Sequence, residues 1–545
     1  MLDLLLRNGT VHTMDRGRPR AHSIGIWHGR VVGVDEQVTD LSALQVVDLD
    51  GATVLPGFHD AHCHTTSFGV AASQLELSGC ANTTSILDRV AQHAAALPTD
   101  AWVIGVGYLD RKDPQRHPTT TELDRAASGR PVWLTHRSGH MCVVSTAVLG
   151  LLPDPLPQQA ERYVEVDPQG RPTGLLEEAA MELVKDAVGP ASVEDIVEAI
   201  GVATHQYVRE GITSFTEAGI GCPGVDHSPL EIAAWQIARQ EGKLQARAQL
   251  MVYSELLHAL PGHPTDAAKL GLDLGLHTGL GDPWLRLGAM KIWLDGAGSA
   301  GRAASSARDG DAEDRGGNLV DDPLRLTATI IAAHHSGWQV AAHAMGDLAV
   351  DLLLDALERS GPTAQVRRRR HRIEHAGLIR PDQIDRIRHL GVVVAIQPAF
   401  IPEFGDSLSS HFGEERVGWS IRGKSLGDAG IVVAASSDRP VAPGAPLGGI
   451  QDMTQRLTAS GVCFGPDERV PVLEAIRAYT SHAAFAAHSE SELGTLTSRR
   501  LADMVVLEED PITVEPSAIS RIEILATVVD GKPVHDPGRL IPELD

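Results

Sequence analysis

Eight short apolar runs constrain the fold of this 545-residue chain more than any other feature. Each run is followed by a loop and then by a helical pattern, and continuous apolar strands are typical of parallel sheets covered on both faces. Eight such strand and helix units predict an α/β fold, a (β/α)8 TIM barrel. The runs span residues 53–59, 212–217, 245–252, 287–294, 339–344, 371–375, 392–397 and 431–436.

The segments outside these units predict two further parts. The segment between the first and second runs is far longer than an ordinary βα connection, which predicts an inserted subdomain over about 75–205. Both ends of the chain carry short β-type runs and turn signals, and neither end is long enough to bury a core alone. We therefore expect residues 1–56 and 485–545 to form one small composite β-sandwich, which encloses a barrel domain over 57–484.

The charge and the cysteines exclude several classes of protein. A formal net charge of −24 at pH 7 repels nucleic acid and anionic lipid, and favours a neutral or cationic small molecule as partner. No stretch approaches the roughly 18 apolar residues of a membrane-spanning helix, and the first residues do not resemble a signal peptide. The five cysteines are scattered without a CxxC pair, which argues against a disulfide framework or thiolate zinc site and favours the cytoplasm.

Ionisable residues stand where several of the apolar runs end. His62 and His64 are two apart in extended chain, so their imidazoles face the same way and can chelate one cation. The carboxyl ends of barrel strands meet at one mouth, where the chemistry of this architecture is found. Imidazole and carboxylate without thiolate suit zinc or another borderline divalent ion, with open positions for water. The other ionisable strand ends are 343–347 (HAMGD), 372–375 (RIEH) and 436–440 (SSDRP), and together with His62 and His64 they predict a cluster of imidazoles and carboxylates.

Five segments of the chain resemble a known family. They are residues 56–64 (PGFHDAHCH), 343–347 (HAMGD), 370–375 (RHRIEH), 437–440 (SDRP) and 494–504. In these motifs the chain is similar, over nearly its whole length, to the metal-dependent amidohydrolase superfamily. The branch that it resembles is the YtcJ-like group, amidohydrolase family 3, which includes enzymes of the N-substituted formamide deformylase type. The motifs identify the superfamily, but they indicate much less about which substrate the protein takes.

The resemblance implies a set of metal ligands. His62 and His64 would hold the more buried metal, His343 and His375 the more exposed one, and Asp438 the attacking water. It implies one or two divalent ions, zinc foremost, with cobalt, manganese or iron as alternatives. Dimers are common among relatives, although the sequence alone does not determine whether this chain is a homodimer.

The family's fourth-strand lysine corresponds to Lys291. A protonated lysine between two dications is electrostatically untenable. If apolar neighbours depress its pKa, the neutral amine can take up carbon dioxide and become a carbamate that bridges two metals. The alternative is a site with a single metal, in which Lys291 pairs with a nearby acid. Glu178 and Glu217 are the carboxylates suspected of bridging instead.

The implied reaction is hydrolysis of a carbon–nitrogen bond in a small molecule, such as an amide, formamide, carbamate or cyclic amide. The metal lowers the pKa of water and polarises the scissile carbonyl. Asp438 takes the proton of the water and passes it to the leaving nitrogen. His371 or Gln397, also at strand ends, would donate to the developing oxyanion or orient the metal ligands. Deamination, or cleavage of an ester or thiocarbamate, would use the same site.

Other features favour no rival catalyst. The sequence has no GxSxG, HExxH or P-loop, and a GxGxxG match at 219–224 contains Pro223, which indicates a plain βα loop. His136 and His140 belong to the insertion, and either reach over the pocket or lie on the surface. Residues 298–304 depart from the Ser-Arg-Thr run of relatives. A binding protein that kept the barrel but lost turnover is the alternative outside enzymes, and the complete ligand set argues against it.

Overall fold

A computed structural model describes the chain except for residues 99–100, 109–115, 138–140, 222–227, 229, 264, 297–302, 307–318 and 543–545. The chain divides into two compact units. The first comprises Met1–Phe68, Ile200–Cys222 and Pro229–Asp545, and the second comprises Gly69–Ala199 and Pro223–Ser228. The domain boundaries expected from the sequence, including the insertion over 75–205, stay predictions.

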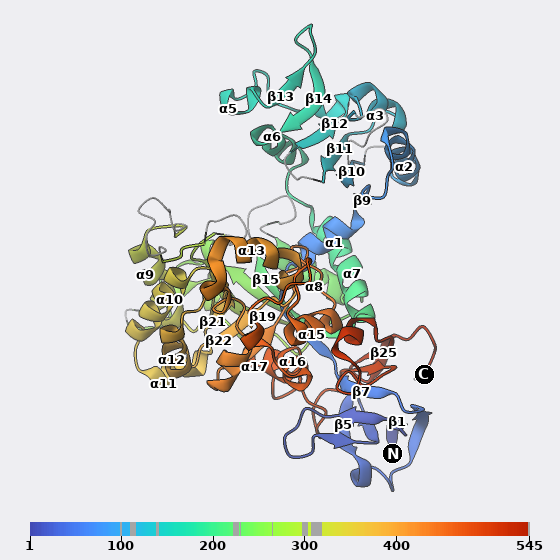
Figure 1. Ribbon diagram of the computed structural model, residues 1–545, viewed down its shortest axis with the longest axis vertical. Helices are drawn as coiled ribbons and strands as arrows, with labels where there is room; N and C mark the ends of the chain where they lie inside the picture. Colours follow the sequence, from blue (N-terminus) through green and yellow to red (C-terminus); the bar gives the residue numbers. More distant parts are fainter. Residues whose placement is uncertain are drawn as a thin grey trace. The chain divides into compact units, whose positions relative to one another are not determined.

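The first unit contains the predicted α/β barrel. One eight-stranded parallel sheet follows the order of the chain from its first strand to its last, so each strand pairs with the next and the sheet curls into a nearly closed ring (Figure 1). Near the open seam, the N–H of Asp438 donates to the carbonyl of His62 at 2.8 Å, and the N–H of His64 donates to the carbonyl of Arg439 at 2.9 Å. The strands are β8 (Phe58–Cys63), β15 (Ile212–Ile220), β16 (Arg247–Tyr253), β19 (Leu285–Trp293), β20 (Val340–Ala344), β21 (Arg372–His375), β22 (Val393–Ile396) and β23 (Val433–Ala435).

The first barrel strand differs from its prediction. Residues 53–59 are not one strand: β7 (Thr53–Pro56) belongs to a different sheet, and the barrel strand β8 begins at Phe58. Gly57 separates them. A Cβ at this glycine would lie 2.1 Å from the Thr213 Oγ1, so the chain passes too close to β15 for any side chain. The apolar run is continuous in sequence, and this close approach is what divides it.

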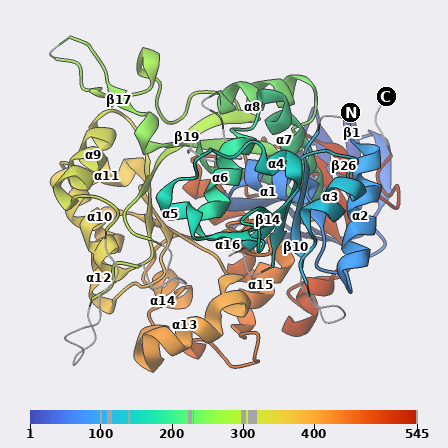
Figure 2. The ribbon, with the colours of Figure 1, turned by 90° about the horizontal axis from the view of Figure 1, so that it is seen from above.

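Helices pack along the outside of the ring. Figures 1 and 2 show α9, α10 and α12 side by side on one flank. α9 begins at Pro323 because Asp322 caps it, accepting the N–H groups of Leu324 and Arg325 at 2.9 and 3.1 Å. The helices of this unit are α8 (Glu231–Gln240), α9 (Pro323–His335), α10 (Asp347–Arg359), α11 (Thr363–Arg369), α12 (Pro381–Leu390), α13 (Phe400–Val417), α14 (Lys424–Asp428), α15 (Pro446–Gln455), α16 (Val472–Ala478) and α17 (Ser481–Ala486). Two further helices, α1 (Thr65–Ser73) and α7 (Val193–Arg209), have residues in both units.

Two sheets near the chain ends share one apolar core. One has the order β5-β4-β1-β6, and the other has the order β26-β25-β24-β7-β2-β3, which mixes strands from both ends of the chain. Leu4, Ile24, Val54 and Val506 belong to a single buried cluster between them. The strands are β1 (Leu2–Arg7), β2 (Thr10–His12), β3 (Arg20–Ala21), β4 (Ile24–Trp27), β5 (Arg30–Val34), β6 (Ala43–Asp48), β24 (Met504–Leu507), β25 (Ile524–Val529) and β26 (Lys532–His535).

The second unit is built on a six-stranded mixed sheet in the order β13-β14-β12-β11-β10-β9. Its strands are β9 (Leu75–Glu76), β10 (Val103–Tyr108), β11 (Val132–His136), β12 (Met141–Val144), β13 (Val164–Val166) and β14 (Pro172–Glu177). Its helices are α2 (Thr83–Ala96), α3 (Thr120–Ala126), α4 (Thr146–Leu149), α5 (Gln158–Glu161) and α6 (Ala179–Val188). Two apolar clusters pack against the sheet, and α2 contributes Ile86 and Val90 to one of them.

The remaining elements of the chain are short. They are the strands β17 (His258–Ala259) and β18 (Leu270–Gly271) and the 3-10 helices η1 (Asp35–Gln37), η2 (Ser254–Leu256), η3 (Asp273–Gly275), η5 (Pro466–Glu468) and η6 (Pro516–Arg521). Among the described residues, no helix combines the length and the apolar composition needed to cross a membrane.

A buried ion pair connects the barrel to the terminal sheet. Arg247 on β16 donates to both carboxylate oxygens of Asp503 at 2.7 and 3.0 Å, and both side chains are 3% exposed. Asp503 also accepts the backbone N–H of Asp530 at 2.9 Å. Removing one partner of such a pair leaves an uncompensated buried charge.

We expect Asp503→Ala to lower the free energy of unfolding by about 3 kcal/mol, because Arg247 loses its buried bidentate partner and keeps only its 3.3 Å contact with the partly exposed Asp530. Urea denaturation followed by circular dichroism measures the change. The matched control is Asp428→Ala, which breaks an exposed pair with Lys424 and should cost about 0–1 kcal/mol. Equal decreases in the free energy of unfolding of the two variants would show that the buried pair stabilises the protein no more than the exposed pair does.

Candidate metal centre

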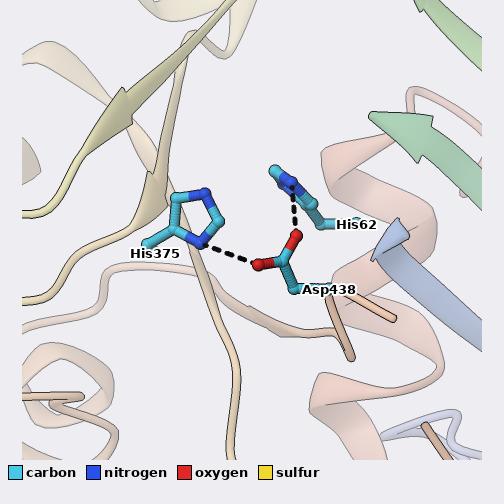
Figure 3. Close-up of side chains that lie close together, drawn as sticks. All are labelled: His62, His375 and Asp438. Atoms are coloured by element: carbon cyan, nitrogen blue, oxygen red, sulfur yellow. Dashed lines mark ion pairs between the residues drawn. The ribbon is translucent and has the colours of Figure 1, made fainter. Parts of the chain in front are cut away.

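Three side chains from distant parts of the chain meet at the mouth of the barrel. His62 lies near the carboxyl end of β8, His375 ends β21, and Asp438 follows β23. Their ligand atoms all lie within 4.8 Å of one another, and all three residues are buried. Figure 3 shows both imidazoles directed at the carboxylate, with His62 Nε2 3.4 Å from Asp438 Oδ1 and His375 Nδ1 3.9 Å from Asp438 Oδ2.

His64 and Lys291 join this cluster. The Nε2 of His64 lies 3.2 Å from Asp438 Oδ1. The Nζ of Lys291, on β19, lies 3.3 Å from the Nε2 of His62. The structure therefore brings five of the predicted site residues into one contiguous group, namely His62, His64, Lys291, His375 and Asp438.

His343 on β20 lies against Trp293 and His375. Its ring stacks on Trp293 with centroids 4.4 Å apart and planes 13° apart, and its centroid is 4.4 Å from that of His375. Both ring nitrogens are buried and accept or donate no hydrogen bond within the described part of the chain. Buried polar atoms are normally satisfied, and a bound cation would satisfy this one. The donor set of imidazoles and a carboxylate thus fits a divalent metal.

Burial sets the charges of these groups. It lowers the pKa of His375 to about 3, and it holds the pKa of His343 well below its usual range, with His375 and Lys291 adding to the effect. Burial alone would raise the pKa of Asp438, but His375, His62 and His64 outweigh it and hold that pKa well below its usual range. At neutral pH, His343 and His375 are therefore neutral and the carboxyl is ionised, which are the forms that bind metal.

The backbone is unusual at the same strand ends. His375, Ala376 and Asp438 have φ of +73°, +50° and +59°, in the left-handed region that residues with a side chain seldom adopt. Such conformations persist where the surrounding structure holds them in place. Here they occur where β21 ends and after β23, at the points from which His375 and Asp438 reach the cluster.

Glu374 holds the orientation of His62, a role that the sequence did not reveal. Its Oε2 lies 2.5 Å from the Nδ1 of His62, and both its oxygens accept from Arg372, at 2.6 and 2.9 Å. Burial would raise the pKa of Glu374, but Arg372 and His62 hold it well below its usual range. Because an ionised carboxylate can only accept, the proton of His62 sits on Nδ1 and leaves Nε2 as the ligand atom.

Gln397 plays the same part for His375. Its amide oxygen lies 2.9 Å from the Nδ1 of His375, and its amide nitrogen donates to the Ser436 Oγ at 3.0 Å. Because an amide oxygen can only accept, Nδ1 of His375 carries the proton. This arrangement agrees with the predicted role of orienting a ligand, one of the two roles open to Gln397.

His371 does not belong to the cluster. It comes immediately before β21, at the amino end of the strand, whereas His375 ends the strand. Its Nδ1 accepts the N–H of Val340 at 2.9 Å, and its Nε2 lies 2.9 Å from His334 Nδ1. Both ring nitrogens are thus engaged at the end of the strand opposite the mouth. The position does not support the predicted role of His371 as an oxyanion donor or as a partner of the ligands.

The other suspected residues have separate environments. Glu217 on β15 accepts the N–H of Thr65 at 2.6 Å, and its Oε1 is 4.0 Å from the Nδ1 of His64. Glu178 stands between β14 and α6 in the second unit, and His136 ends β11 there with its ring 5.1 Å from that of Tyr108. His140, residues 298–302 and residues 222–224 of the 219–224 loop lie outside the described residues.

Asp295 is a second supporting residue that the sequence did not reveal. Fully buried, it accepts the N–H groups of Met345, Gly346 and Ala304 at 2.9, 2.7 and 2.9 Å. It therefore connects the loops that follow β19 and β20, and its Oδ1 lies 3.7 Å from the Nε2 of His343. Burial raises the pKa of Asp295 to about 6, against the opposing effect of the backbone N–H donors.

The cluster opens into a cavity of about 150 Å³. Among the residues that the structure describes, its ionisable lining consists of His64, Lys291, His343, His375 and Asp438, and the rest of the lining is apolar. A small molecule that enters this cavity therefore meets the ligand set directly.

We expect Glu374→Gln to weaken metal binding by about 10–100-fold, because the variant loses the charge that orients His62 and stabilises its Nδ1–H. Competition with a chromophoric chelator measures the affinity. Glu490→Gln, which alters a partly exposed pair with Arg370, is the control. A folded Glu374→Gln protein that binds metal as tightly as the wild type would refute this role.

Three comparisons relate the chain to known proteins. The sequence model described as "Amidohydrolase family" matches residues 45–535. Protein LONG AFTER FAR-RED 3 of Arabidopsis thaliana is 32% identical, covering 98% of this chain and 91% of that protein, and the N-substituted formamide deformylase of Arthrobacter pascens is 29% identical, covering 97% and 98%. An uncharacterized metal-dependent hydrolase from Pyrococcus furiosus superposes with a TM-score of 0.76 at 27% identity, covering 94% of this chain and 100% of that one. The chain belongs to the amidohydrolase family of metal-dependent hydrolases, as its strand-end motifs predict.

Proposed function

We propose that this chain hydrolyses a carbon–nitrogen bond of a small molecule, namely an amide, formamide, carbamate or cyclic amide. The observation that carries the proposal is His343, whose two buried ring nitrogens have no hydrogen-bond partner in the described structure beside the His62, His375 and Asp438 cluster. The similarity to a formamide deformylase supports the formamide and amide classes.

The residues that would hold the metal are His62, His64, His343, His375 and Asp438, with zinc as the ion that best suits their chemistry. Bound there, a divalent ion would lower the pKa of water and polarise the scissile carbonyl. Glu374 and Gln397 fix the tautomers of His62 and His375, so both rings are oriented before substrate arrives.

Asp438 is the proposed proton carrier. It is held ionised in a buried position, and its carboxylate lies on the wall of the cavity. Asp438 acts first as general base, taking a proton from the attacking water, and then as general acid, giving that proton to the leaving nitrogen. Cobalt, manganese or iron in place of zinc would leave this role of Asp438 unchanged.

Lys291 supports a second metal. Its Nζ lies 3.3 Å from the Nε2 of His62, a predicted ligand atom, and Lys291 lines the cavity, so a carbamate on Lys291 would supply an anionic ligand for a second ion. Glu217, buried and 4.0 Å from His64, is the competing carboxylate. Deamination and ester or thiocarbamate cleavage would require the same Asp438, and they differ from amide hydrolysis only in the substrate.

We expect removal of metal by a chelator to abolish hydrolysis of N-formyl and N-acyl amines, and re-addition of zinc to restore it. Asp438→Asn should lower kcat by about 10²- to 10⁴-fold because the general base is lost. Release of free amine measures turnover, and metal analysis of each variant shows whether zinc is retained. Asp406→Asn, an exposed aspartate on α13, is the control.

The outcomes separate the candidate functions. A metal-loaded Asp438→Asn enzyme with wild-type turnover would remove Asp438 from the mechanism. A metal-loaded wild type that turns over esters or aminated rings but no amide would favour the alternative hydrolase and deaminase activities. Tight binding of the compounds without any turnover would favour the non-enzymatic binding protein.

We expect protein prepared with bicarbonate to hold two metals per chain, and Lys291→Ala to hold one, because the carbamate is the anion that bridges the pair. Carbon-13 NMR of protein loaded with labelled bicarbonate tests for the carbamate carbon directly. Two metals with no carbamate signal would transfer the bridging role to Glu217, which Glu217→Gln then tests. One metal in both proteins would establish the single-metal site.

A further inference from the structure

The cavity has an apolar wall that the proposed chemistry does not use. Phe400, Phe404 and Leu408 are spaced four residues apart on α13, so they share one face of the helix, and all three line the cavity. Trp293, Met345 and Val441 complete the apolar lining. The wall therefore comes from one helix, with single contributions from three loops or strand ends.

This wall begins at the metal ligands. The Phe400 ring is parallel to that of His375, with planes 3° apart and centroids 6.3 Å apart. Phe404 then meets Phe400 edge to face, with centroids 5.2 Å apart and planes 80° apart. Phe400 is 8% exposed and Leu408 is 4% exposed, while Phe404 is only partly buried. A group attached to the reacting carbon or nitrogen would thus lie directly against Phe404.

The charges in the cavity all belong to the reaction centre. Among the described lining residues, the ionisable groups are three imidazoles, Lys291 and Asp438, and none is an arginine or a glutamate. A charged substituent on the substrate would lose water without gaining a partner at the apolar wall, which is costly. An apolar substituent would instead replace water against Phe400, Phe404 and Leu408, which is favourable.

We propose, building on the proposed hydrolase function, that the substrate is an uncharged amide that carries an aromatic or similarly bulky apolar group, and that Phe400, Phe404 and Leu408 select this group. The cavity of about 150 Å³ has room for one such group. The occupant of the wall is therefore part of the small molecule that reacts.

The direct test compares the N-formyl and N-acetyl derivatives of phenethylamine, propylamine and 1,3-diaminopropane on zinc-loaded enzyme. The phenethyl compound should have a kcat/KM about tenfold or more above that of the propyl compound, and the cationic compound should be the poorest. Phe404→Ala should reduce the phenethyl-to-propyl ratio about tenfold, mainly through KM, because the contact acts on binding. Phe404→Leu should restore part of the ratio.

Phe412→Ala is the matched control, because Phe412 lies on the same helix and is buried but does not line the cavity. It removes an aromatic ring from α13 at a position outside the cavity lining, so the ratio should stay at its wild-type value. Thermal unfolding of each variant shows whether α13 remains folded. An unchanged ratio in Phe404→Ala, or an equal loss in Phe412→Ala, would overturn the assignment of the wall.

A binding measurement separates this inference from the proposed function. Calorimetry on Asp438→Asn protein compares the Kd of N-phenethylformamide with that of N-propylformamide, and it needs no turnover. Preference for the phenethyl ligand together with an inactive wild type would support the wall and refute the hydrolase proposal. Equal affinities, no detectable binding of either ligand, or tighter binding of the propyl ligand would overturn the wall itself.

Discussion

The candidate metal centre depends on one buried ion pair, the bidentate contact between Arg372 and Glu374. Both side chains are fully buried, and Arg372 also donates to the Ala61 carbonyl at 2.7 Å, next to His62. The pair therefore connects β8 and β21, which are not neighbours in the sheet, through the barrel interior. Replacing both members of such a buried pair with well-packed apolar residues often leaves the stability of a protein unchanged. Its consequence here is geometric, since it fixes the ring of His62.

A large part of this centre could be predicted from the residues alone. Parallel strands end at one mouth, so the ionisable residues that end apolar runs converge there whatever their separation in the sequence. His64, His343, His375 and Asp438 all line one cavity. Lys291, which only the family resemblance indicated, lines the same cavity and contacts His62. The spacing of two between His62 and His64 carries a direction as well as a position. These signals depend only on the two-residue period of a strand and on the parallel topology, so they can be recognised in the sequence alone.

The parts that could not be predicted depend on contacts with no periodic signal. The run 371–375 has a histidine at each end, and only the direction of the strand in the ring decides that His375 faces the mouth. The break at Gly57 arises from its distance to Thr213, which belongs to another strand. Asp295 acts through backbone amides of distant loops. The four-residue spacing on α13 is what any helix with a buried face shows, so it does not distinguish a cavity wall from ordinary core.

The shared sheet at the chain ends has a consequence for biosynthesis. β24 lies between β25 and β7, and Val505 pairs with Leu55. The ribosome therefore makes β7 long before it makes β24, the strand that pairs with it. At ribosomal speeds of about 5–20 residues per second, that delay is on the order of tens of seconds. During translation the apolar residues of β7 have no cover from β24, and neighbouring nascent chains on one messenger offer competing strand edges. Completion of the last strands, after the barrel has emerged, determines when this edge is protected.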